Sequence, residues 1–201
     1  MKTDWLLLVY RVPTEPSKHR VQIWRKVKAT GAVFLQNSVC VLPATRSHEQ
    51  EFRRLRQYIV EECGGQAYVF LCQHLGPPGV LEPIFNRARD EEYAEIIHRC
   101  EEFLQELEEE TASSHFTFAE LEENEEDLAK LETWYEKVKK RDLLHASLGP
   151  KAEEMLAACR KSLALFSNRV FAADNGRTHP GPGEGESSAP SQDDTDQGKS
   201  R

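Results

Sequence analysis

Basic side chains recur at helical spacing in two stretches of the first 60 residues. Cationic side chains on neighbouring helix faces can neutralise several phosphates at once, which makes nucleic-acid binding steeply dependent on salt. Such contacts fix position more than sequence, and no base-reading helix is evident. The spacing therefore favours a phosphate-binding surface, and the alternative is a solvated helix face without a partner. The candidate residues are Lys18, Arg25, Lys26, Arg53 and Arg54.

Three further arginines have the chemistry of an oxyanion site. The planar guanidinium fork matches the geometry of tetrahedral oxyanions. A pocket formed by Arg11, Arg87 and Arg89 would hold a sulfate-like oxyanion or a backbone phosphate. The alternative is that Arg87 and Arg89 form ion pairs with the acidic residues 90–92 at the start of a helix.

Metal binding and catalysis find little support in the sequence. Cys72 and His74 end a predicted strand, and His98 and Cys100 are two residues apart on a predicted helix, where such positions do not share a face. Five cysteines, with no CxxC spacing, predict reduced structural thiols and not a disulfide framework. No flavin, nicotinamide or nucleophile motif is present. We therefore expect a protein that is not an enzyme and holds no metal or cofactor.

The basic residues must be positioned by the elements of the first 75 residues. The continuously apolar run at 5–10 predicts a strand covered on both faces or central in a sheet. Capping residues, glycines and β-branched runs predict the elements that follow. These are a helix at 17–30, a hairpin at 32–42 that turns at Gln36-Asn37, a helix at 45–63 and a strand at 67–71.

This β-α-β-β-α-β order is that of the ferredoxin-like split βαβ arrangement, in which both helices cover the same face of the sheet. On helix 17–30 the apolar residues occupy one broad side, opposite the basic residues, so we expect that side to face the core. Its members are Val21, Ile23, Trp24 and Val27.

After residue 80 the pattern changes from short strands to long helices. Apolar residues that repeat every three or four positions predict helices at about 88–111, from Thr117 and from Pro150. Thr117-x-x-Glu120 is a capping box that opens the second of them. We expect an α+β protein with a ferredoxin-like domain at 4–75, a helical bundle of about three helices at 80–174 and a disordered acidic tail at 175–201.

Charge is distributed unevenly along the 201 residues. The net charge is −8, but residues 1–60 carry +7 and residues 61–174 carry −13. This asymmetry predicts an anionic partner for the first part and an acidic, solvated body for the rest. The longest apolar runs are too short for a transmembrane helix or a signal peptide, so we expect a cytoplasmic protein without a membrane partner. An unused apolar stripe on the later helices would mediate a homodimer.

Several separated motifs resemble the N-terminal domain of the chromate-resistance protein ChrB family. The resemblance covers roughly residues 4–174. It implies a regulatory or accessory role in a chromate-resistance operon, because full-length members, which carry a further C-terminal domain, are thought to be chromate-responsive transcriptional regulators. The motifs are WLLLVYRVPTEPS from residue 5, WRK from 24, GAVFLQNSV from 31, LP from 42, FNRARDEEY from 85, LETW from 131, RD from 141 and CRKSLALFSNRV from 159.

Two functional hypotheses follow. The leading one is a non-enzymatic regulator that binds DNA through the two basic helices, and the other is an oxyanion-binding module, for chromate or a similar ion, or a protein-interaction module without DNA affinity. The predicted core is also similar to that of small CRISPR-associated nucleases, which place a metal-binding aspartate just after the first strand. Here Arg11 occupies that stretch and cannot bind a divalent cation, so we exclude nuclease activity.

Overall fold

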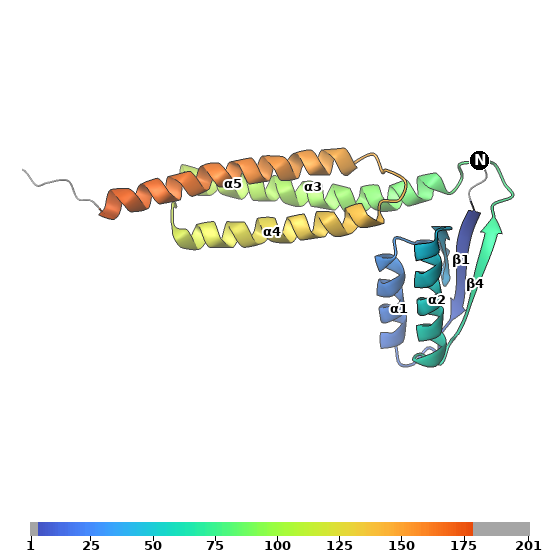
Figure 1. Cartoon of the computed structure of the whole chain (residues 1–201). Helices are drawn as coiled ribbons and strands as arrows, with labels where there is room; N and C mark the ends of the chain where they lie inside the picture. Colours follow the sequence, from blue (N-terminus) through green and yellow to red (C-terminus); the bar gives the residue numbers. More distant parts are fainter. Residues whose placement is uncertain (1–3, 179–201) are drawn as a thin grey trace, which may run out of the picture.

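The computed structural model describes residues 4–178 and combines a four-stranded sheet with long helices (Figure 1). The α+β class expected from the sequence is confirmed. The elements are β1 (Asp4–Arg11), α1 (Lys18–Ala29), β2 (Val33–Gln36), β3 (Val39–Pro43), α2 (Arg46–Glu61), β4 (Gln66–Gln73), α3 (Glu82–Ala112), α4 (Phe118–Arg141) and α5 (Gly149–Thr178).

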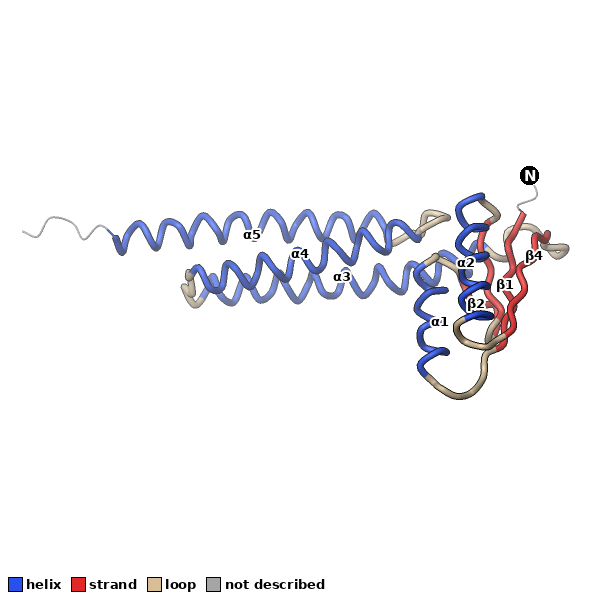
Figure 2. The backbone as a smooth tube through the Cα atoms, turned by 60° about the horizontal axis from the view of Figure 1, so that its bottom comes forward, coloured by secondary structure: helices blue, strands red, loops and turns tan. Residues whose placement is uncertain are grey.

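The sheet has the strand order β2-β3-β1-β4, and all neighbouring strands are antiparallel. Strand β1 is therefore an inner strand, as its continuous apolar run predicted, with Leu8 opposite Cys40 on one side and Val69 on the other. Helices α1 and α2 lie side by side on one face of the sheet (Figures 1 and 2). Ile23 and Val27 of α1 and Phe52 and Ile59 of α2 are fully buried in this layer.

Helices α3, α4 and α5 lie side by side and extend away from the sheet (Figures 1 and 2). They share a second buried apolar cluster, which is separate from the cluster under α1 and α2. Thr117 caps α4, because its Oγ1 accepts a hydrogen bond from the backbone N–H of Glu120 over 3.2 Å, as the capping box predicted. Trp5 of β1 stacks on Phe85 of α3, with ring centroids 5.6 Å apart, and so joins the sheet to the long helices.

Three element boundaries differ from the predicted ones. Helix α3 begins at Glu82 and not at 88, because Pro83 fits the first helical turn, where no N–H is needed. The hairpin turn falls one residue later than predicted, at Asn37 and Ser38, and Ser38 adopts a positive φ of 65°. Helix α5 continues through 175–178, the first residues of the predicted tail. The rest of that tail lies outside the described residues.

The predicted inward side of α1 is too broad. Val21 is 48% exposed and Trp24 is 51% exposed, whereas Ile23 and Val27 are buried as expected. Helix α1 is at the end of the two-helix layer, so α2 covers one of its flanks and no described helix covers the other (Figure 1). Apolar residues on the uncovered flank therefore stay in contact with solvent.

Candidate nucleic-acid interface

Helix α1 carries five cations and no acidic residue. Lys28 is half-buried and the other four are exposed. Lys26 and Lys28 are in the last turn, where cations interact favourably with the partial negative charge of the helix end. The helix therefore presents uncompensated positive charge to solvent. The five cations are Lys18, Arg20, Arg25, Lys26 and Lys28.

The flank of α1 that faces α2 is tied to it by side chains. The Tyr58 hydroxyl donates a hydrogen bond to Oε1 of Gln22 over 2.8 Å, and the Lys26 ammonium lies 4.6 Å from the centroid of the Tyr58 ring. Lys18 is one helical turn before Gln22, and Arg54 is one turn before Tyr58, so each shares a face with a residue of this contact.

Arg25 is three residues after Gln22 and so lies on the same face of α1. Four of the five predicted phosphate-binding residues therefore share one exposed surface around this contact, which we call the basic surface. No described residue forms an ion pair with Lys18, Arg25 or Arg54, so these charges are not neutralised within residues 4–178. The basic surface consists of Lys18, Arg25, Lys26 and Arg54.

Arg53, the fifth predicted residue, does not join the basic surface. Its Nη2 forms an ion pair with Oε1 of Glu49 over 2.7 Å, on the flank of α2 that faces β4. Consecutive residues on a helix are about 100° apart, so Arg53 and Arg54 lie on different flanks. The spacing of Glu49 and Arg53, four residues apart, was visible in the sequence as a signal for this pairing.

The three arginines of the predicted oxyanion pocket are not brought together. Arg11 is at the end of β1 opposite Gln66, six residues along the strand from Trp5, which contacts α3. Six residues of strand span about 20 Å. Arg87 and Arg89 are both on α3, but Arg87 is exposed and Arg89 is buried. The arrangement therefore does not form the three-arginine site expected from the sequence.

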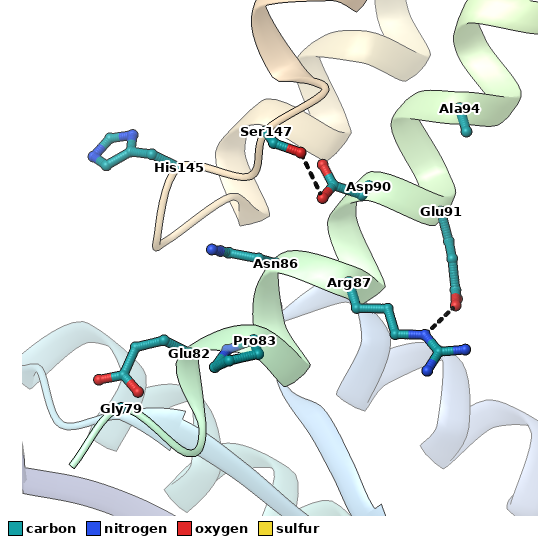
Figure 3. A pocket seen from close by; sticks show the side chains of 10 residues that line it. All are labelled: Gly79, Glu82, Pro83, Asn86, Arg87, Asp90, Glu91, Ala94, His145 and Ser147. Carbon is teal, nitrogen blue, oxygen red and sulfur yellow. Dashed lines mark hydrogen bonds and ion pairs between the residues drawn. The ribbon is translucent and has the colours of Figure 1, made fainter.

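Arg87 lines a surface hollow of about 710 Å³ between α3 and the segment before α5 (Figure 3). Its Nε lies 3.2 Å from Oε1 of Glu91, so the ion-pair alternative is confirmed for this residue. Glu82 and Asp90 add further carboxylates to the wall. Asp90 accepts hydrogen bonds from Ser147 Oγ over 3.0 Å and from the backbone N–H of Leu148 over 2.8 Å. This acidic lining repels an oxyanion.

Arg89 is only 2% exposed, and its Nη2 lies 3.4 Å from Oε1 of Glu92. The pKa of Arg89 is lowered from its ordinary value, mainly because the group is buried and also because Arg141 lies nearby. The carboxylate of Glu92 partly opposes this shift. The Tyr93 hydroxyl donates a hydrogen bond to Asp142 over 3.3 Å at the same junction. The Tyr93–Asp142 hydrogen bond joins α3 to the residue that follows α4. Arg89 itself pairs within α3, and its Nε, Nη1 and Nη2 are buried without a hydrogen-bond partner among the described residues.

Residues 4–178 contain no cluster of three or more histidine, cysteine or carboxylate side chains suited to a metal ion. In the same range, no helix combines the length and the apolar composition needed to cross a bilayer. The basic surface is thus the best candidate for a functional site.

Comparisons with known proteins agree with the motifs. The family model described as "Protein ChrB, N-terminal" matches residues 20–177. A segment of 42 residues is 45% identical to Protein ChrB of Cupriavidus metallidurans (strain CH34), and it covers 21% of this chain and 13% of that protein. The chain therefore matches only a small part of this curated relative, whereas the family match includes α2 and nearly all of α1.

Proposed function

Because the chain belongs to the ChrB N-terminal family, we propose that it is a chromate-resistance protein that regulates by binding DNA through the basic surface. The observation that carries the proposal is helix α1, with five cations, no acidic residue and no described ion-pair partner for Lys18 or Arg25. A duplex offers phosphates at a spacing that a helix with this charge can follow.

The scaffold supports this use of α1. We propose that residues 4–73 adopt the ferredoxin-like split βαβ fold, which is supported by the strand order β2-β3-β1-β4 and by two helices on one face. In this arrangement the sheet holds α1 and α2 side by side, and the Tyr58–Gln22 hydrogen bond fixes their mutual position. The four cations of the basic surface are thus carried by two helices that pack on the same sheet face.

The charge distribution gives the proposal a quantitative form. Each phosphate that a cation neutralises on a duplex changes the slope of log K against log salt by about −0.9. Four cations on the basic surface predict a slope of about −3.6 if all of them contact phosphate. The acidic helices beyond residue 80 would repel DNA, so binding should be confined to the α1 and α2 layer.

The test is fluorescence anisotropy of the purified chain with its own upstream duplex and a scrambled duplex, over a salt series, with and without chromate. The test variant reverses the charge at the four positions of the basic surface to glutamate. The control variant instead changes four exposed lysines of α4 and α5 to glutamate, K137E, K140E, K151E and K161E, so that both variants change the net charge by the same amount. We expect loss of binding in the test variant and unchanged binding in the control.

Absence of duplex binding at low salt, or an equal loss in both variants, would refute the DNA contact. Binding that chromate weakens would assign the chromate response to this chain. If chromate does not change the affinity for DNA, the DNA contact stands and the response to chromate belongs to another protein or domain.

A further inference from the structure

A groove runs along the flank of α1 that α2 does not cover. It lies between α1 and the strands β1 and β2, and its volume is about 910 Å³. We call it the α1 groove. Three aromatic side chains and two cations define it: Tyr10, Phe34, Trp24, Arg20 and Lys28.

Trp24 gives the α1 groove its chemical character. Half of this side chain is exposed, together with the neighbouring Val21, on a helix whose remaining exposed surface is strongly basic. Covering the apolar face of a large aromatic ring removes it from water and is energetically favourable. An exposed tryptophan in a groove therefore indicates a ligand with a flat face. Phe34 and Tyr10 extend the aromatic lining below it.

The charges around the groove select the ligand further. Arg20 and Lys28 line it, and no acidic residue among 4–178 does. The Lys28 ammonium lies 6.0 Å from the centroid of the Trp24 ring. Ser17 and Asn37 add a hydroxyl and an amide at the rim. The groove therefore combines a stacking surface, positive charge and groups that can form hydrogen bonds with the edge of a ring.

We propose that the α1 groove binds an unpaired nucleobase that stacks on Trp24, with its flanking phosphates held by Arg20 and Lys28. This inference deepens the proposed function and rests on it, because the groove and the basic surface are two flanks of the same helix. The ligand class is a single-stranded nucleic acid.

An unpaired base fits better than a duplex at this place. In a duplex both faces of a base are covered by its neighbours, so Trp24 has no free face to stack on. Proteins that bind single strands combine aromatic platforms with a positively charged groove, and each stacked base contributes measurably to affinity. An apolar peptide would use Trp24 and Phe34 but would leave Arg20 and Lys28 without a partner.

The experiment compares labelled oligo-dT and oligo-U 12-mers with a 12-base-pair duplex by anisotropy at one salt concentration. The test variants are W24A and the conservative W24F. The matched control is F70A, which removes a different half-exposed aromatic, on β4. We expect W24A to weaken single-strand binding about tenfold, W24F to retain most of it, and F70A and duplex binding to change less than twofold.

Because half of the Trp24 side chain is buried, far-UV circular dichroism is used to check that W24A is folded. If that variant does not fold, R20E serves in its place, because Arg20 is exposed and lines the groove. R20E should reduce single-strand binding in the same direction.

The outcomes separate the two proposals. Duplex binding without single-strand binding, or single-strand binding that W24A leaves intact, overturns the groove assignment and leaves the proposed function standing. Single-strand binding without duplex binding overturns the proposed duplex contact and leaves the groove assignment standing. If the protein binds neither nucleic acid, both proposals are overturned. A loss in F70A as large as in W24A would show that the effect is not specific to Trp24 and would overturn the groove assignment. Competition by thymidine monophosphate as strong as that of the oligomers would overturn the assignment to a strand.

Discussion

The guanidinium group of Arg141 donates a hydrogen bond from Nη1 to the backbone carbonyl oxygen of Lys28 over 3.3 Å, at the last turn of helix α1. Its Nη2 lies 3.0 Å from Oε2 of Glu92 on α3. One side chain from α4 thus connects the basic helix with the long helices. A cation at the C-terminal end of α1 also interacts favourably with the helix dipole. The position of α1 therefore depends on residues more than 100 positions later in the chain.

Replacing Arg141 by alanine should destabilise the protein. The change removes two hydrogen bonds in a partly buried site and an exposed one from Nε to the carbonyl oxygen of Lys137, and it leaves Glu92 with only the Arg89 contact. We expect the free energy of unfolding to fall by about 1–3 kcal/mol. The measurement is urea unfolding followed by circular dichroism.

The control for this prediction is R99A. Arg99 forms an ion pair with Glu102 over 2.8 Å, but both side chains are about half exposed, and such pairs contribute at most about 0.5 kcal/mol. Equal midpoints for R141A and R99A would show that the contact with Lys28 contributes nothing to stability.

Gly31 lies beside the same junction and gives a second prediction. Its φ is +84°, and a Cβ at this position would be 3.2 Å from the carbonyl oxygen of Arg141. Gly64 also has a positive φ, +61°, but no atom lies within 4 Å of its Cβ position. The left-handed conformation alone costs a non-glycine residue about 1–2 kcal/mol.

G31A should therefore be more destabilising than G64A in the same urea experiment. The difference between the two variants measures the close approach to Arg141 together with the less favourable φ of Gly31, because both positions share the left-handed region. If the two midpoints coincide, the backbone at Arg141 moves aside without cost.

Local patterns were predicted well, and so were the inner place of β1 and the two helices on one face of the sheet, but the flanks of helices that other elements cover were not. The apolar run of β1 and the Thr117 cap are local patterns with one physical interpretation. The exposure of Trp24 depends on which flank of α1 another element covers, and a helical wheel does not contain that information. Arg89 lies in an acidic run that suggested a helix start, yet α3 begins earlier and packing buries Arg89.

The buried thiol of Cys40 should make the free energy of unfolding fall as the pH rises above about 9. Burial raises the pKa of this thiol from its ordinary value of 9.0 to about 12. Between these values the unfolded chain loses the proton while the native protein keeps it, so the unfolded state binds fewer protons and stability falls as pH rises. Below pH 9 the contribution of Cys40 is fully present.

The measurement is urea unfolding at pH 8 and pH 10 for the natural chain and for C40A. For one such group we expect a loss of about 1 kcal/mol over this interval, and C40A should lose that much less than the natural chain. Other groups that titrate in this range contribute equally to both proteins, so identical losses would show that Cys40 ionises as freely in the native state as in the unfolded one.

Arg53 and Arg54 are neighbours in sequence with different surroundings, and they give the sharpest test of the basic surface. Arg54 has no described ion-pair partner and lies on the flank next to Tyr58. Arg53 is paired with Glu49 over 2.7 Å on the other flank. A cation that contacts a phosphate directly contributes about one unit to the salt slope of duplex binding.

R54Q should therefore reduce the slope by about one unit and weaken binding uniformly across sequences. R53Q should change the slope little, because the paired guanidinium is on the flank away from α1 and already neutralised. Both variants remove one positive charge from α2, so the comparison cancels the effect of net charge. An equal change in slope for the two variants would mean that DNA responds to the overall charge of the helix and not to the basic surface.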